Sequence, residues 1–236
     1  MTSLEQKPIN PSLSFLEGIK QVPFEADLLD EVGDGSWTIN DSSIHAYGIG
    51  VYFPKYGRNP IEAIVDRIGR KDTNVAMDLA GGSNGAALQG LMEMGVIGTG
   101  LVTNYEDRRC PATREIESLD HVEGDLTKRC TWERIIEWAD LHTDGGFDLI
   151  MHRPVGGLQY LPPKIYSGAV QALIELLKPG GLIFCQIPYK LTDIHDNPEI
   201  KAIGDELKRN SKVEKIARSK SPDGYDQHAL IYRACQ

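Results

Sequence analysis

The sequence predicts an α/β fold built on a doubly wound, mostly parallel sheet. Three observations carry this prediction. From residue 74 onwards, apolar strand-like segments alternate with helical segments; a glycine-rich segment follows the first strand; and the chain ends in two strands joined by a tight turn. Parallel strands need helical crossovers, so the alternation favours a parallel sheet. The last two strands have no helix between them, which predicts an antiparallel finish.

Short apolar runs mark the strands, and apolar residues spaced three and four apart mark the helices. The expected strands are 74–80, 100–104, 121–123, 147–152, 182–187, 213–219 and 229–232. The expected helices between them are 84–94, 132–139, 166–177 and 199–208. We expect Pro179-Gly180-Gly181 to end the helix 166–177, because glycine and proline commonly follow a helix C-terminus. The last two strands are expected to meet at Pro222-Asp223-Gly224.

Residues 1–73 read as an N-terminal extension, and residues 74–236 as the α/β domain. Pro60 suits the first position of a helix, and the apolar residues that follow it have helical spacing, so one helix is predicted over residues 60–69. We expect the extension to pack at the carboxyl edge of the sheet. It also contains the aromatic stretch His45, Tyr47, Tyr52, Phe53 and Tyr56. That stretch is either a lid over the reacting group or simple packing onto the sheet.

Composition limits the function classes. The 236 residues carry a net charge of −9, which disfavours nucleic acid and anionic membranes as partners. No run of apolar residues is long enough for a membrane span, and the N-terminus does not resemble a secretory signal. The four cysteines include no C-x-x-C pair, so we expect reduced cysteines, no metal site and a cytoplasmic location. Sequence does not predict the oligomeric state.

The candidate ligand site follows the first strand. The segment DLAGGSNG, residues 78–85, lies where a doubly wound sheet binds its ligand, and small residues let the backbone approach that ligand. Asp78 ahead of the glycines suits a cationic or amine-bearing ligand better than a phosphate. The spacing Ala80-x-Gly82-x-x-Gly85 nevertheless satisfies a loose dinucleotide fingerprint. A nicotinamide-dependent oxidoreductase therefore stays an alternative.

Several segments, taken in order, resemble a known enzyme family. They are VAMDLAGGSNG (75–85), EGDL (123–126), FDLIMHRP (147–154), LLKPGGLIF (176–184) and the final strand pair. From about residue 74 to its end, the chain resembles the class I S-adenosylmethionine-dependent methyltransferases. The resemblance implies a Rossmann-like sheet of strand order 3-2-1-4-5-7-6 with an antiparallel last strand. It also implies S-adenosyl-L-methionine as cofactor, and we expect a small-molecule methyl acceptor.

The resemblance also implies cofactor contacts. In the first motif they fall on Asp78, Ala80, Gly81, Gly82 and Asn84. Ala80 and Asn84 stand where the family usually has glycines. This departure keeps open a third hypothesis, a non-catalytic binding protein on the methyltransferase fold.

Three further residues are implied at the next two strands. Asn104 occupies the place of an acid that holds the ribose hydroxyls, with Glu106 and Asp107 just beyond it, and Asn104 can bind a hydroxyl only without charge assistance. By resemblance, Asp125 accepts a hydrogen bond from the adenine amino group, and Leu126 contacts the ring. Asp125 has a second interpretation, as the cap of a turn or of the following helix.

His152, at the end of the fourth predicted strand, is the candidate catalytic residue. Its ordinary pKa lies near the working pH, so it is a candidate general base. It is equally interpreted as a core or cofactor-contacting histidine. The basic cluster Arg108, Arg109 and Arg114 is interpreted as a solvated face, with an acidic substrate as the alternative. The chain lacks the N-P-P-Y or D-P-P-Y segment used in amine methylation of nucleobases, which disfavours that reaction.

Overall fold

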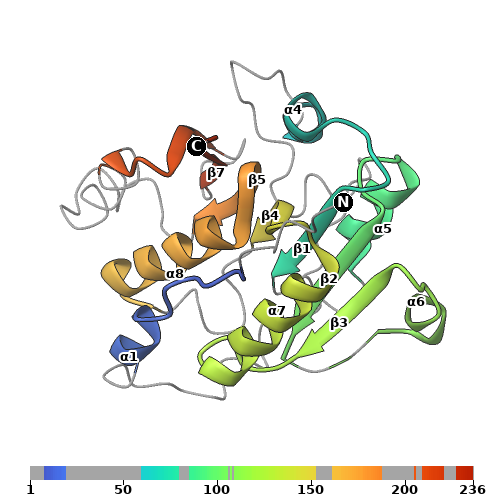
Figure 1. The fold of residues 1–236 in the computed structure, drawn as a ribbon, viewed down its shortest axis with the longest axis horizontal. Helices are drawn as coiled ribbons and strands as arrows, with labels where there is room; N and C mark the ends of the chain where they lie inside the picture. The colour runs from blue at the N-terminus through green and yellow to red at the C-terminus, as the bar shows by residue number, and fades with distance from the viewer. Residues whose placement is uncertain are drawn as a thin grey trace, which may run out of the picture.

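The computed structural model describes residues 8–19, 60–79, 85–105, 107, 109–152, 161–187, 205, 209–220 and 227–235. In this part of the chain, helices pack on both faces of one sheet (Figure 1). The strands are β1 (Val75–Leu79), β2 (Thr99–Asn104), β3 (Leu119–Glu123), β4 (Phe147–His152), β5 (Leu177–Ile187), β6 (Val213–Lys220) and β7 (Gln227–Arg233). The helices are α1 (Phe15–Ile19), α4 (Pro60–Ile68), α5 (Ala86–Glu93), α6 (Pro111–Arg114), α7 (Arg129–His142) and α8 (Pro163–Leu176).

The order of the strands confirms the predicted topology. It is β3-β2-β1-β4-β5-β7-β6, and the strands β1 to β5 pair with one another in parallel. Strand β7 runs antiparallel to both β5 and β6. The order reverses between β1 and β4, and Leu79 and His152 lie in register there. The carboxyl ends of these two strands therefore meet at the switch point of the sheet, which is where doubly wound folds bind ligands.

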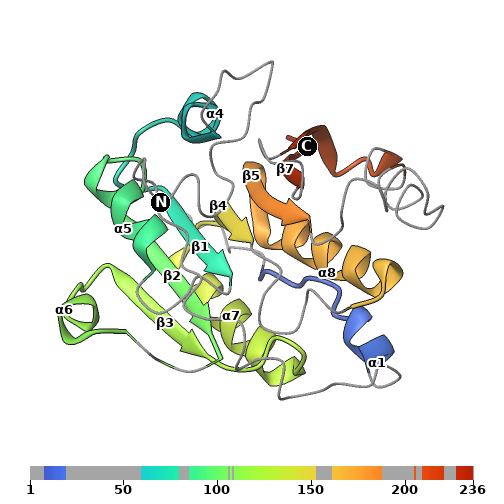
Figure 2. The ribbon, with the colours of Figure 1, turned by 180° about the vertical axis from the view of Figure 1, so that it is seen from behind.

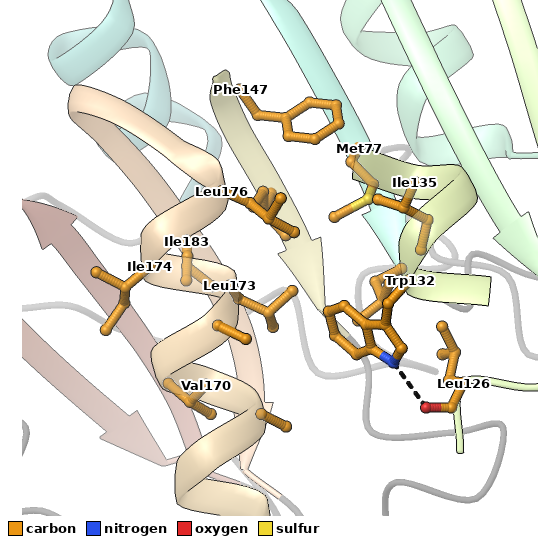
Figure 3. Close-up of a cluster of buried hydrophobic side chains, with 14 of the residues drawn as sticks. Met77, Leu126, Trp132, Ile135, Phe147, Val170, Leu173, Ile174, Leu176 and Ile183 are labelled. Atoms are coloured by element: carbon orange, nitrogen blue, oxygen red, sulfur yellow. Dashed lines mark hydrogen bonds between the residues drawn. The ribbon is translucent and has the colours of Figure 1, made fainter. Parts of the chain in front are cut away.

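Two apolar clusters cover the two faces of the sheet. Met77 and Leu79 of β1 pack in the cluster that contains α7 and α8, and Ala76 packs in the cluster that contains α4 and α5. Trp132 is fully buried in the first cluster, and its Nε1 donates to the carbonyl of Leu126 at 2.8 Å (Figure 3). Burying a side chain of this size stabilises the fold by roughly 1.5–3 kcal/mol. Helices α7 and α8 are therefore packed firmly against this face of the sheet.

Four buried residues of the segment 8–19 belong to the apolar cluster of the α7–α8 face: Leu13, Phe15, Leu16 and Ile19. Helix α1 lies beside α8 in both views (Figures 1 and 2), and the Phe15 ring packs edge-on against Trp132 at 5.3 Å. A Cβ on Gly168 of α8 would come within 2.6 Å of Phe15 Cβ, so this glycine permits the close approach. Ser12 N–H donates to Glu175 Oε2 of α8 at 2.7 Å. The sequence did not predict α1, because its five residues give too short a pattern.

The junction of α8 and β5 differs from the prediction. The helix ends at Leu176, and β5 begins at Leu177, so Pro179-Gly180-Gly181 lies inside the strand. The ladder to β4 shifts register there, and Gly180 has a φ of +84°. Proline disfavours helical backbone in the residue before it, so the helix stops ahead of Pro179. The predicted turn is therefore an irregularity in a strand.

Some of the remaining predictions fall on described residues, and others fall outside them. The helix predicted at 60–69 is confirmed as α4, and the strand at 147–152 as β4. Most of the helix predicted at 199–208, the turn at 222–224 and the aromatic stretch of the extension lie outside the described residues. The division at residue 73 stays a prediction. In the part of the chain that is described, no helix has both the length and the apolar character needed to cross a membrane.

Candidate functional site

Polar side chains gather at the carboxyl edge of the sheet, where four neighbouring strands end. Asp78 is the fourth residue of β1, whereas Asn104, Glu123 and His152 end β2, β3 and β4. The register pairs Asn104 with Glu123, and it pairs Leu79, the neighbour of Asp78, with His152. The structure therefore brings these residues, three of which the sequence predicted, to one edge of the sheet.

Asp78 is completely buried at this edge. Met77 and Leu79 pack toward α7 and α8, so the intervening Asp78 points to the other face, which α5 covers. A carboxyl group in such a place is costly unless it is paired or hydrogen-bonded. This position suits the predicted contact with a cationic or amine-bearing ligand, and that role stays a prediction.

Gly85 fixes the chain where the predicted ligand loop ends. It precedes α5 with φ +57° and ψ +36°, and a Cβ there would lie 2.4 Å from Val102 Cγ2 on β2. Only glycine combines this left-handed backbone with so close an approach. Helix α5 therefore begins tightly against β2. The predicted contacts Ala80, Gly81, Gly82 and Asn84 lie outside the described residues and stay predictions.

Asn104 lies beside a histidine that the sequence did not single out. Its Nδ2 is 3.4 Å from His121 Nε2, and its carbonyl accepts from Gly124 N–H at 2.7 Å. Burial lowers the pKa of His121, which keeps its ring largely neutral near pH 7. The end of β2 therefore presents an amide beside a neutral ring.

The predicted basic cluster is bound within the molecule. Arg109 donates to both oxygens of Asp107, at 2.9 and 3.2 Å, and Arg114 Nε lies 3.6 Å from the same carboxylate. The bond from Arg109 holds the pKa of Asp107 well below its usual range. Arg109 is largely buried in this pairing, whereas Arg114 stays exposed, so the interpretation as a solvated face fits Arg114 and not Arg109. The acidic-substrate site stays a prediction. Arg108 lies outside the described residues.

Asp125 and Leu126 follow β3. Asp125 Oδ1 accepts from Thr127 N–H at 2.8 Å and from Thr127 Oγ1 at 2.7 Å, a side-chain cap of its own turn. No described residue donates to Oδ2, so the capping role leaves one oxygen for a ligand. Leu126 is buried, and its carbonyl accepts from Trp132. The predicted adenine contacts stay predictions.

His152 has the surroundings of a core histidine. It is fully buried, its Nε2 lies 3.2 Å from Tyr166 Oη of α8, and the two rings stack at 5.8 Å. No described residue hydrogen-bonds its Nδ1. Burial lowers its pKa to about 3, so the ring stays neutral at physiological pH. The general-base role stays a prediction, and a histidine with so low a pKa would be an unusually weak base.

Two site residues were missed by sequence reasoning. Tyr166, which covers His152, lies fourteen positions along the chain and was expected only as a helix residue. Glu123 was noted as part of EGDL without a role of its own. The register between β2 and β3 is the signal that singles it out, since it places Glu123 opposite Asn104. Among the described residues, no group of three or more His, Cys, Asp or Glu side chains is arranged to hold a metal ion.

Comparison with known proteins adds a structural likeness. No protein-family model matches the sequence, and no curated protein does. A candidate SAM-dependent methyltransferase from Streptococcus mutans aligns with 74% of this chain and 48% of its own, at 13% identity and a TM-score of 0.50. The N-methyltransferase NodS from Bradyrhizobium japonicum aligns over 74% and 96%, at 14% identity and 0.45. A candidate rRNA methylase from Clostridium thermocellum aligns over 70% and 89%, at 15% identity and 0.45.

The likeness concerns the fold. The Streptococcus mutans structure and the strand order of the sheet together give this chain the Rossmann-like fold of the class I methyltransferases.

Proposed function

We propose that this chain binds S-adenosyl-L-methionine and transfers its methyl group to a small-molecule acceptor. One observation carries the proposal. Asp78 and Asn104 lie at the carboxyl ends of β1 and β2, and Asp125 follows the end of the neighbouring β3 by two residues, in a methyltransferase fold. Their order across the sheet is the order in which the resemblance assigns them to the cationic part, the ribose and the adenine of the ligand.

The chemistry of these residues fits such a ligand. The Asp78 carboxyl group, when ionised, suits a cationic or amino group, and the Asn104 amide both donates and accepts hydrogen bonds. Asp125 Oδ2 is an acceptor that suits the adenine amino group. The Leu126 N–H donates to no described group, so it can serve a ring nitrogen. Gly85, which no larger residue can replace without a clash, sets the start of α5 close to β2.

The proposed reaction requires little proton transfer by the protein. When bound, the cofactor supplies a methyl group that its sulfonium has already activated for in-line attack. The residues at the sheet edge then contribute binding and orientation, which can lower the barrier of a two-reactant step by roughly 7–11 kcal/mol. A base is needed only where the acceptor must lose a proton. His152 is the hypothesis for that base, and its low pKa restricts it to a minor contribution.

Two alternatives compete with the proposal. A nicotinamide-dependent oxidoreductase would place a diphosphate at the β1–α5 loop, close to the Asp78 carboxyl group, which disfavours it. A non-catalytic binding protein would bind the cofactor and transfer nothing.

Calorimetric titration with S-adenosylmethionine, S-adenosylhomocysteine and NAD separates the oxidoreductase from the two alternatives that bind S-adenosylmethionine. We expect the first two to bind and NAD not to bind. Asp78→Asn should weaken binding, whereas Asp72→Asn, the same change at an exposed position close in the chain, should leave it unchanged. Folding of both variants is checked by circular dichroism. Binding of NAD alone would overturn the proposal.

The acceptor needs a second assay. Radiolabelled S-adenosylmethionine is incubated with the protein and either a small-molecule extract or total RNA. Label in the small-molecule fraction is the expected result. Label in RNA would overturn the acceptor class and keep the methyl transfer. Cofactor binding with no transfer to either pool would favour the non-catalytic alternative.

A further inference from the structure

We propose that Glu123, at the end of β3, supplies the carboxylate that holds the ribose diol of the adenosine ligand, a role for which β2 offers only Asn104. The inference rests on the proposed function and deepens it by naming a residue that fixes the choice of sugar.

Glu123 and Asn104 point to the same side of the sheet. Their Cα atoms are in register at the ends of adjacent parallel strands, about 4.8 Å apart in the hydrogen-bonding direction. Val102 packs in the α4–α5 cluster and Val122 in the α7–α8 cluster, so alternation turns both Asn104 and Glu123 toward the α5 face. Asp78 on β1 points to that face too. A polar row therefore crosses the edge from β1 to β3.

The other acids near this row are occupied. Asp107 holds Arg109 and Arg114 through both of its oxygens. Asp125 commits Oδ1 to the turn at Thr127. Among the described acids after β2 and β3, Asp107 therefore has both oxygens engaged by arginines, and Asp125 has one oxygen engaged by Thr127.

Glu123 keeps acceptor capacity. Its side chain is exposed, and its Oε2 accepts from Asp107 N–H at 3.0 Å. No described residue donates to Oε1. A carboxylate has about four lone-pair sites, so the backbone bond leaves most of them open. Two neighbouring hydroxyls need acceptors, and a charged acceptor forms stronger hydrogen bonds than a neutral one. Glu123 beside Asn104 offers both kinds to one diol.

Glu123 could also have a purely structural role, because it anchors the loop after β2 by accepting from Asp107 N–H. Glu123→Gln separates the two roles. The glutamine carbonyl can still accept from Asp107 N–H, so the loop anchor is kept, whereas the charged acceptor for a hydroxyl is lost. Glu117→Gln removes one negative charge from an exposed position six residues earlier and serves as the matched control.

The test measures binding, by calorimetry, of S-adenosylhomocysteine and of its 2′-deoxy and 3′-deoxy ribose analogues. The parent should prefer the full diol. Glu123→Gln should weaken S-adenosylhomocysteine binding about tenfold to a hundredfold and should lose most of that preference. Glu117→Gln should behave as the parent. Circular dichroism and the urea midpoint verify that Glu123→Gln is folded.

Three results would overturn the inference, and they differ. If the parent binds S-adenosylhomocysteine and Glu123→Gln keeps the parent's affinity and preference for the diol, Glu123 is only a loop anchor. If Glu106→Gln, made in the same series, loses the preference instead, the carboxylate belongs to the chain directly after β2. If the parent does not bind S-adenosylhomocysteine at all, the proposed function itself fails and the inference falls with it.

Discussion

Two glycines at the two ends of α5 allow the geometry of the site's framework to be tested by stability alone. Gly85 precedes the helix with φ +57°, and Gly95 follows it with φ +66°. A Cβ on Gly85 would meet Val102 Cγ2 at 2.4 Å, whereas a Cβ on Gly95 would meet nothing within 4 Å. Alanine at either position must adopt left-handed backbone, but only alanine at 85 must also displace a buried neighbour.

The expected costs follow from these differences. Left-handed backbone costs a non-glycine residue roughly 1–2 kcal/mol, so Gly95→Ala should lower the free energy of unfolding by about that amount. Gly85→Ala adds an overpacking cost of roughly 1–3 kcal/mol because Val102 is completely buried. We therefore expect a total loss of about 2–5 kcal/mol for Gly85→Ala.

A double-mutant cycle isolates the contact. Val102→Ala alone leaves a cavity and should cost roughly 1.5–3 kcal/mol. Because it removes Cγ2, the double variant should be more stable than the sum of the single variants, by about 1–3 kcal/mol. Urea unfolding followed by circular dichroism gives all four values, and the m-value should stay constant. Equal costs for Gly85→Ala and Gly95→Ala, or an absent coupling with Val102, would refute the reasoning.

Three further outcomes are expected. The pKa of Asp107 is lowered in the folded protein, so Asp107 stabilises the fold above its unfolded pKa, and this stabilisation is lost as the pH falls below about 4. In that range, the urea midpoint of Asp107→Asn should fall less steeply with decreasing pH than the midpoint of the parent. His152 stays neutral in the folded protein but takes up a proton in the unfolded chain. Between about pH 6 and pH 3, the free energy of unfolding should therefore fall by about 1.4 kcal/mol for each unit by which the pH decreases. His152→Phe should remove this slope. Asp125→Ala should weaken S-adenosylhomocysteine binding roughly tenfold to a hundredfold and reduce its preference over the inosine analogue, whereas Thr127→Val should lower stability only; unchanged binding in Asp125→Ala would make Asp125 a turn cap and nothing more.

The fold was largely predictable because its signals are local. Buried parallel strands such as β4 are mostly apolar over a short run, and α4 shows its apolar residues at helical spacing, so both appear in the sequence. Helix α1 was not predictable in this way. Its burial depends on Gly168 and Trp132, which lie more than a hundred residues away, and five residues carry too little periodicity. The register shift at Gly180 likewise depends on the partner strand.

The candidate site was predictable in position but not in environment. Strand ends could be located from the sequence, which is why Asp78, Asn104 and His152 lie at the expected edge. The sequence left a core histidine and a general base open as interpretations of His152, and the choice between them depends on Tyr166 of α8 lying over the ring. The position of Glu123 required the register between two strands, since a shift of one residue would have turned its side chain to the opposite face.

The alternation of side chains gives the two halves of this edge opposite characters. Asp78, Asn104 and Glu123 point to the α5 face, whereas Leu79 and the neutral His152 belong to the α7–α8 face. A ligand lying across the strand ends therefore meets acceptors along one side and uncharged, mostly apolar groups along the other. The period of two in a β-strand thus separates the acceptors of this edge from its uncharged groups, and a protonated His152 would break that separation.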